Sequence, residues 1–257
     1  MMETIQKISI TVLIVYILIG LFLYMTQKSL LYFPTPNMST SYPSMTFKND
    51  GETISVIVLN EGNENAILYF GGNAESMARS ADYIARQFPY FTVYLMDYRG
   101  YGASTGEPSE ETLYSDALKL YDSIEGKHKR ISLGGRSLGS GIATYVAANR
   151  EGSKLALITP FDSIVSVAQA MYPIYPARIL LHANAYDSAS RAKDISADIF
   201  IVMAENDRVI ARKNSENLIE AFQGKNLKVD TIENRGHNDI SSDERYYKIM
   251  QDFIGKG

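Results

Sequence analysis

The pattern of apolar residues divides the chain into one long hydrophobic segment and a region of short alternating runs. Residues 8–25 (ISITVLIVYILIGLFLYM) contain no charged side chain. A helix of about 18 such residues can just cross the hydrocarbon core of a bilayer. We therefore predict a transmembrane anchor over residues 1–29. Because Pro34, Pro36 and Pro43 break regular structure, residues 30–45 are predicted to be a linker.

The sequence does not decide whether this segment is retained or cleaved, nor how it is oriented in the membrane. A cleavable signal peptide is the alternative, although residues 27–30 (QKSL) offer no small-x-small cleavage site. Lys7 and Lys28 put one basic residue on each flank, so the positive-inside rule barely selects an orientation. We expect a retained single-pass anchor in the lipid bilayer, with the large domain on the extracytoplasmic side.

The rest of the chain alternates between short apolar runs and segments of helical spacing. The expected strands are residues 53–60, 66–70, 92–96, 131–133, 155–159, 198–203 and 229–232, and the expected helices are residues 75–88, 109–124, 138 onward, 214–222 and 242–253. This alternation predicts an α/β domain over residues 46–257, with a mostly parallel sheet and helices on both of its faces. The first two runs, separated by residues 61–65, predict a hairpin at an antiparallel edge.

A single long insert, residues 161–193, interrupts this alternation and predicts a small lid. Its apolar residues 171–176 (MYPIYP) suit either a surface that binds an acyl chain or ordinary packing over the sheet. Ligands of such sheets bind at the carboxyl ends of the strands. Residues that directly follow a strand are therefore the first candidates for chemistry.

Composition narrows the kinds of site that the chain can form. The 257 residues carry a net charge of −4 and include no cysteine, which excludes disulfides, thiolate catalysis and cysteine-based metal sites. The sequence has no basic run of the kind that binds nucleic acid. We expect neither a metal nor a cofactor.

The segment 129–147 (KRISLGGRSLGSGIATYVA) carries the clearest candidate for chemistry. It predicts a strand, a tight turn and a helix, and the turn matches G-x-S-x-G at residues 135–139. In a nucleophile elbow the serine occupies a strained turn, and a Cβ on a flanking glycine would collide with a neighbouring strand or helix. The five-residue pattern alone is weak, and the predicted strand and helix around Ser137 make it informative.

A serine nucleophile needs a base, and the chain has three histidines. His237 follows the last predicted strand, and Gly236 allows a close backbone approach. His128 lies in a charged turn before the elbow strand, where we expect it to be solvated. His182 lies in the insert and is the weaker candidate. We therefore predict His237 as the base.

The acid that orients the base is expected between serine and histidine in the chain. Asp207 meets this order and directly follows the strand at residues 198–203. Glu205, closer to the strand end, is its nearest competitor and suits a structural role. Asp97 precedes the serine, and we expect it to pair with Arg99 and shape a loop.

Two backbone N–H groups are expected to stabilise the oxyanion of the reaction. One belongs to Leu138, directly after the nucleophile, and the other to Asn73, in the Gly71-Gly72-Asn73 turn that follows a strand. In the absence of the elbow this turn would be an ordinary connection between strand and helix. Arg136, inside the elbow, could reach either a substrate or neighbouring carboxylates.

Taken together, these motifs resemble the α/β-hydrolase superfamily, and more narrowly its membrane-anchored Bem46-like and ABHD-type serine hydrolases. The supporting segments are the N-terminal anchor, FGGNAE (70–75), DYRGYGASTG (97–106), GRSLGSG (135–141), ENDRVI (205–210) and RGHND (235–239). The resemblance implies hydrolysis of lipid esters or acyl thioesters, with peptidases among more distant relatives. The family usually has His-Gly-Asn where this chain has Gly71-Gly72-Asn73.

The residues and the resemblance lead to one main hypothesis. The chain is predicted to be a serine hydrolase that cleaves a small acyl ester or thioester through Ser137, His237 and Asp207. Two alternatives remain open. One is a serine peptidase on the same fold, although the chain lacks an added propeller-like domain. The other is a non-catalytic binding protein that kept the hydrolase fold.

Overall fold

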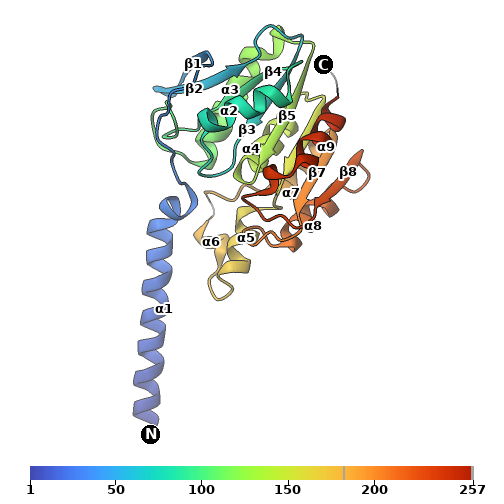
Figure 1. Ribbon diagram of the computed structural model, residues 1–257. Coiled ribbons are helices and arrows are strands. Elements are labelled where there is room, and N and C mark those ends of the chain that lie inside the picture. Colours follow the sequence, from blue (N-terminus) through green and yellow to red (C-terminus); the bar gives the residue numbers. More distant parts are fainter. Residues whose placement is uncertain (182, 256–257) are drawn as a thin grey trace.

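The apolar N-terminal segment forms one long helix, α1 (Met2–Leu31), which projects from the rest of the molecule (Figure 1). The computed structural model describes residues 1–181 and 183–255. Mean hydropathy over an 18-residue window of α1 reaches 2.6, and none of this window is buried. By length and composition the helix can cross a membrane, and its exposure distinguishes it from a core helix. The helix ends at Leu31, and the next residue, Tyr32, has an extended backbone two residues before Pro34.

The chain after α1 folds around an eight-stranded sheet with helices on both faces, as the alternation predicts. The order of strands is β1-β2-β4-β3-β5-β6-β7-β8, and neighbours from β4 to β8 are parallel. The strands are β1 (Ser44–Asn49), β2 (Glu52–Leu59), β3 (Asn65–Phe70), β4 (Thr92–Met96), β5 (Arg130–Arg136), β6 (Lys154–Ile158), β7 (Asp198–Ala204) and β8 (Leu227–Ile232).

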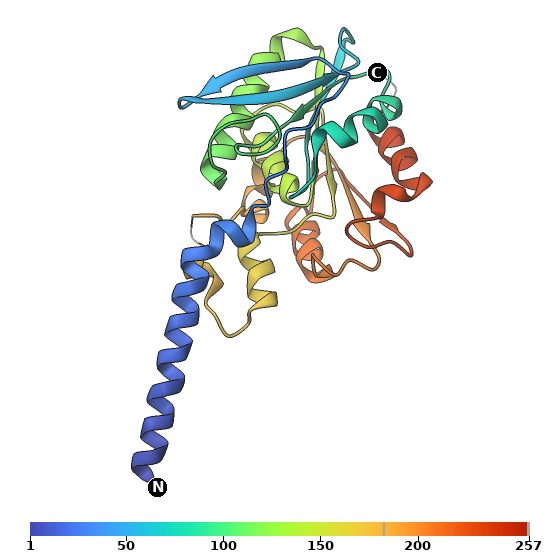
Figure 2. The ribbon, with the colours of Figure 1, turned by 60° about the vertical axis from the view of Figure 1, so that its left-hand side comes forward.

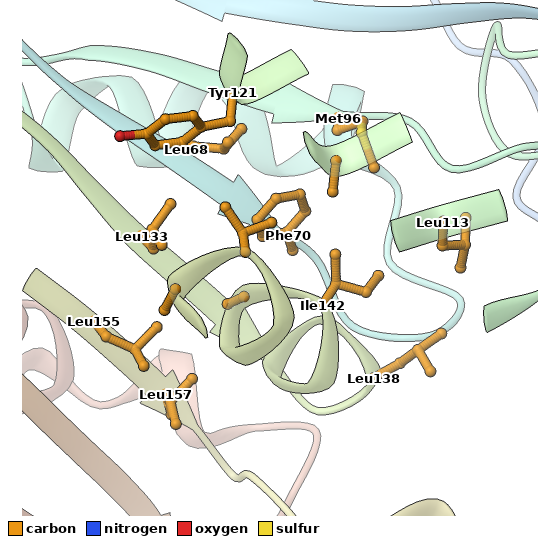
Figure 3. Close-up of a cluster of buried hydrophobic side chains, with 14 of the residues drawn as sticks. Leu68, Phe70, Met96, Leu113, Tyr121, Leu133, Leu138, Ile142, Leu155 and Leu157 are labelled. Atoms are coloured by element: carbon orange, nitrogen blue, oxygen red, sulfur yellow. The ribbon is translucent and has the colours of Figure 1, made fainter. Parts of the chain in front are cut away.

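The helices divide between the two faces of this sheet. The helices after α1 are α2 (Met77–Gln87), α3 (Glu110–Ile124), α4 (Leu138–Asn149), α5 (Ile164–Met171), α6 (Ala177–Leu180), α7 (Ser188–Arg191), α8 (Arg212–Ala221) and α9 (Glu244–Ile254). The larger core lies under α3, α4 and α8, with Leu113, Ile142 and Leu218 buried in it. Figure 3 shows its centre, where α4 lies across the strands that carry Phe70 and Leu133. The second core lies under α2 and α9.

The predicted hairpin between residues 53–60 and 66–70 is wrong. Strand β4 lies between β2 and β3, and all five of its residues are buried, so it needs a partner on each side. The antiparallel edge is instead formed by β1 and β2, with Asn49 opposite Glu52. Asp50 and Gly51 make the turn with φ of 49° and 85°, the two positive values of a type I′ hairpin. Strand β1 thus begins inside the expected linker.

A buried ion pair ties the loop after β4 to α3. The Arg99 guanidinium donates to both carboxylate oxygens of Asp116, over 2.8 and 2.9 Å. Asp116 is fully buried and also accepts from the Asn49 side chain. The expected pairing of Asp97 with Arg99 is therefore wrong. Asp97 accepts from the Ala103 N–H over 3.2 Å, and burial raises the pKa of its carboxyl to about 6.

This buried pair yields a stability prediction. We expect Asp116→Ala to lower the free energy of unfolding by about 3 kcal/mol, because it removes the buried partner of Arg99. The Arg99 guanidinium then keeps only the exposed Asp50 carboxylate, over 3.2 Å, as a charged partner. Denaturant unfolding in detergent micelles measures the loss. The control is Asp122→Ala at the exposed Arg150–Asp122 pair, where the expected loss is below about 1 kcal/mol. Equal losses in both variants would contradict the assignment.

Candidate active site

The turn between β5 and α4 holds Ser137 in a strained backbone conformation. Its φ is 49° and its ψ is −118°, a region that residues with a side chain rarely adopt. The Ser137 N–H donates to the Ile158 carbonyl on β6 over 2.9 Å, which anchors the turn to the neighbouring strand. The expected geometry of an elbow is therefore present.

The flanking glycines are required for the close packing of this turn. A Cβ on Gly135 would lie 2.4 Å from the Gly139 carbonyl oxygen, and one on Gly139 would lie 2.1 Å from that of Phe70. Both distances are far below van der Waals contact, and the clashing atoms belong to the backbone. The steric clash expected from the sequence is therefore confirmed. A Cβ on Gly135 would clash within the turn itself, and a Cβ on Gly139 would clash with the end of β3.

Ser137, His237 and Asp207 form a continuous hydrogen-bonded relay. His237 Nε2 lies 2.9 Å from Ser137 Oγ, and Nδ1 lies 2.7 Å from Asp207 Oδ2. The side chains of His237 and Asp207 are only 9% and 10% exposed. The second oxygen of Asp207 accepts from the N–H groups of Val209 and Ile210, each over 2.8 Å. Those bonds fix the carboxylate and leave Oδ2 for the imidazole.

The loops that carry the acid and the base follow adjacent strands, β7 and β8, and are bonded to each other. The Asn206 N–H donates to the Arg235 carbonyl over 2.8 Å. Glu205 accepts from the Asn234 N–H over 2.7 Å, which agrees with the structural role expected for it. The Asp97 carboxylate accepts from the Ala103 N–H in its own loop and takes part in none of these bonds.

Arg136 supports the histidine from the elbow side. Its guanidinium donates to the His237 carbonyl over 3.0 Å and lies 3.7 Å from the Glu75 carboxylate. Of the two roles considered for Arg136, the structure therefore shows contact with a neighbouring carboxylate and, in addition, with the His237 loop. No local motif predicts this second contact, because it joins residues 101 positions apart.

The Gly71-Gly72-Asn73 turn lies beside the nucleophile. A Cβ on Gly72 would lie 3.8 Å from Ser137 Cβ. The Gly72 N–H donates to Glu75 over 2.7 Å and is occupied. Within residues 1–181 and 183–255, neither the Asn73 nor the Leu138 N–H donates to another protein group. Both amides are therefore free to bind an oxyanion.

Gly71 stands where the resembled family has a histidine, and the structure shows what fills the space. A Cβ on Gly71 would lie 2.2 Å from the terminal methyl of Met77. The Gly71 carbonyl accepts from the Tyr98 hydroxyl over 2.6 Å. The turn is thus supported by Met77 packing and by a tyrosine in place of an imidazole.

The Asn73 side chain joins this turn to the end of α1. Its Nδ2 donates to the Leu31 carbonyl over 2.6 Å, and its Oδ1 accepts from the Phe33 N–H over 3.0 Å. The Tyr101 hydroxyl donates to the same oxygen over 2.7 Å. No local motif predicts this contact, because it depends on where the linker folds back on the domain.

His128 takes no part in the relay. His128 lies just before β5, at the opposite end of this strand from Ser137. Its Nε2 lies 2.9 Å from the Tyr94 hydroxyl. His128 is half-buried and less solvated than expected, and this partial burial lowers the pKa of its imidazole. His182 lies outside the described residues.

Comparison with known proteins identifies relatives of this chain. Residues 62–183 match the family model described as serine aminopeptidase, S33. An uncharacterized protein of Mycobacterium tuberculosis is 30% identical over 235 residues, covering 85% of this chain and 83% of its own. An uncharacterized membrane protein of Saccharomyces cerevisiae is 29% identical, with 80% and 72% covered. The alpha/beta hydrolase domain-containing protein 17B of Xenopus laevis is 26% identical, with 64% and 56% covered.

Solved structures share the fold at lower identity. An esterase of Pyrococcus furiosus superposes with a TM-score of 0.66 at 14% identity, covering 87% of this chain and 96% of its own. An enol-lactonase of Burkholderia xenovorans superposes with a TM-score of 0.63 at 16% identity, covering 82% and 99%. The sheet, the matching family model and the relatives lead to one assignment: the chain is a hydrolase of the α/β-hydrolase superfamily.

Proposed function

We propose that the protein is a membrane-anchored serine hydrolase that cleaves carboxylic ester or thioester bonds of acyl substrates. The observation that carries the proposal is the relay from Ser137 through His237 to Asp207, with both hydrogen bonds formed. In this relay each group has the neighbour that its role requires. No residue of the relay needs to move to begin the reaction.

The reaction follows from these contacts. Ser137 Oγ attacks the substrate carbonyl carbon while His237 Nε2 takes the hydroxyl proton. The tetrahedral intermediate then expels the alcohol or thiol, which receives that proton from His237. Water attacks the resulting acyl-enzyme and gives a proton to His237. Collapse of the second intermediate releases the carboxylic acid and returns the proton to Ser137. Asp207 holds the imidazole tautomer and stabilises the imidazolium.

The developing oxyanion is bound by the Leu138 and Asn73 N–H groups. Leu138 is the first residue of α4, so its amide also lies at the positive end of the helix dipole. Such donors are fixed before the reaction begins, and each one typically contributes about two to three orders of magnitude in rate.

A serine peptidase is the second candidate, because the matched family model carries an aminopeptidase description. The same relay would serve amide hydrolysis, so the two functions differ only in the substrate. A panel of p-nitrophenyl esters, acyl thioesters and aminoacyl p-nitroanilides separates them. Ester or thioester turnover exceeding anilide turnover by about tenfold or more supports the proposal, and the reverse order favours the peptidase.

Labelling by a fluorophosphonate probe tests the nucleophile and the acid. We expect the wild type to be labelled and Ser137→Ala to be unlabelled, with Ser123→Ala on α3 as the control. Asp207→Asn should slow labelling by roughly three to four orders of magnitude, since the imidazole loses its orienting partner. Asp97→Asn should label within about threefold of wild type. The assignment would be contradicted if Ser137→Ala were labelled as fast as the wild type, or if Asp97→Asn lost more labelling than Asp207→Asn.

For the membrane, we propose that residues 1–29 remain as the anchor, residues 30–45 link it, and the domain at 46–257 lies on the extracytoplasmic side. The absence of cysteine makes single-cysteine variants clean reporters. A membrane-impermeant maleimide should label Tyr90→Cys in intact cells and Met2→Cys only after permeabilisation. Both positions are exposed, at 64% and 84%. The reverse pattern would overturn the orientation, and a purified mass lacking residues 1–29 would overturn the retained anchor.

A further inference from the structure

An apolar cavity of about 380 Å³ lies between the C-terminal half of α1 and the insert that contains α5 and α6. A volume of this size suits a small-molecule ligand. Its α1 wall includes Leu23, Leu30 and Leu31, and its opposite wall includes Val167, Ala168 and Leu180. Apolar atoms dominate both walls. A second cavity, of about 470 Å³, lies between α2 and α9. Ser137 and His237 line neither cavity.

The insert runs along α1 well beyond this cavity. The Tyr16 hydroxyl donates to the Ile174 carbonyl over 2.9 Å, and the Tyr16 and Tyr175 rings stack with centroids 4.8 Å apart. Figures 1 and 2 show α5, α6 and the loop between them beside α1 in both views. Tyr16 lies nine residues before Met25, which corresponds to about 14 Å along the helix. If residues 8–25 span the bilayer, the tip of the insert reaches about halfway through its hydrocarbon core.

The exposed side chains of the insert are mostly apolar, as expected for a segment that lies within the hydrocarbon core. Ile174 and Ile179 are 70% and 69% exposed, and Met171 is 59% exposed. Exposure of this much clustered apolar surface is unfavourable in water and favourable in lipid. Arg178, in α6, is the single charged residue between residues 164 and 181. A side chain of its length can extend its charge towards the lipid headgroups.

Several polar backbone groups at the tip also have partners, which a hydrocarbon environment favours. The Ile174 carbonyl is paired with Tyr16. The Gln169 side chain donates to the Pro173 carbonyl over 3.1 Å and accepts from the Ala177 N–H over 3.2 Å. Pro173 and Pro176 have no N–H to satisfy.

The cavity adjoins the candidate active site. Its lining residues Leu31 and Phe33 are hydrogen-bonded through their backbone to the Asn73 side chain. The next residue along, Gly72, lies beside Ser137. Asn73 thus links the cavity wall to the loop beside Ser137, and a chain that leaves the cavity along this loop would approach the Ser137 hydroxyl.

From these observations we infer that α1 and the insert together form an acyl-binding cleft immersed in the membrane. The substrate is then a long-chain acyl ester or thioester whose chain enters from the bilayer and whose carbonyl reaches Ser137. The inference rests on the proposed serine hydrolase function. In it the N-terminal helix is a wall of the substrate site as well as an anchor.

Depth measurements test the immersion without reference to activity. Full-length Ile174→Cys and Tyr90→Cys proteins, each labelled with a nitrobenzoxadiazole dye, are placed in phosphatidylcholine vesicles. Doxyl-labelled lipids should quench the Ile174→Cys label at least about threefold more than the Tyr90→Cys label, and aqueous iodide should show the opposite preference. Equal iodide quenching at both positions would overturn the immersion of the insert.

Chain-length preference tests the cleft. We expect a hexadecyl fluorophosphonate to label the wild type at least about tenfold faster than an ethyl one, a difference of about 1.4 kcal/mol. Leu23→Trp, which fills the α1 wall, should abolish this preference, so that the ratio of hexadecyl to ethyl labelling rates falls to about one. Ala168→Trp should do the same from the opposite wall. Leu21→Trp, about 200° around the helix from Leu23, is the matched control and should keep the preference.

The outcomes separate this inference from the proposed function. If neither probe labels the wild type, the serine hydrolase proposal fails. If both probes label at equal rates and the two cavity variants change nothing, the cleft is overturned while the hydrolase stands. Loss of the preference in Leu21→Trp as in Leu23→Trp would also overturn the cleft, since the effect would then belong to the helix as a whole.

Discussion

The site depends on the backbone of one residue. Ser137 adopts φ of 49° without being glycine, a conformation that costs roughly 1–3 kcal/mol. The cost is offset by the bonds on either side of it, where its N–H donates to Ile158 and its carbonyl accepts from the Ser140 N–H. Close approach of Gly139 to the Phe70 carbonyl then fixes α4 against β3. The position of α4 and the direction of the Ser137 hydroxyl follow from this one turn.

The charges around the turn are arranged so that each has an assigned partner. Asp207 gives one oxygen to two backbone amides and the other to His237, so the carboxylate cannot rotate without losing hydrogen bonds. Arg136 holds the His237 carbonyl and faces Glu75, which in turn occupies the Gly72 amide. The same guanidinium thus contacts the backbone of the base directly and the Gly71-Gly72-Asn73 turn through Glu75. Such preorganisation is the main source of electrostatic stabilisation in active sites.

The sequence was a good guide to elements and a poor guide to pairing. Short apolar runs that alternate with helical segments predict seven of the strands to within a few residues. Strands that are buried on both faces of a parallel sheet are apolar at nearly every position, which makes such runs easy to recognise. The hairpin was misplaced because an Asp-Gly turn at residues 50–51 competes with a longer turn at 61–65, and only the three-dimensional position of β4 decides between them. Asp116, the true partner of Arg99, lies on a helix face that local spacing describes simply as apolar.

Long-range contacts also explain why the role of the insert could not be decided from its composition. Residues 171–176 suit packing and acyl binding equally, and a lid that only covered the sheet would turn its apolar side chains inward. Here Tyr175 is buried against α1 while Ile174 faces outward. Asn73 ties the last turn of that same helix to the loop beside Ser137. Because one side chain contacts both, the position of α1 relative to the domain and the geometry around the nucleophile are linked.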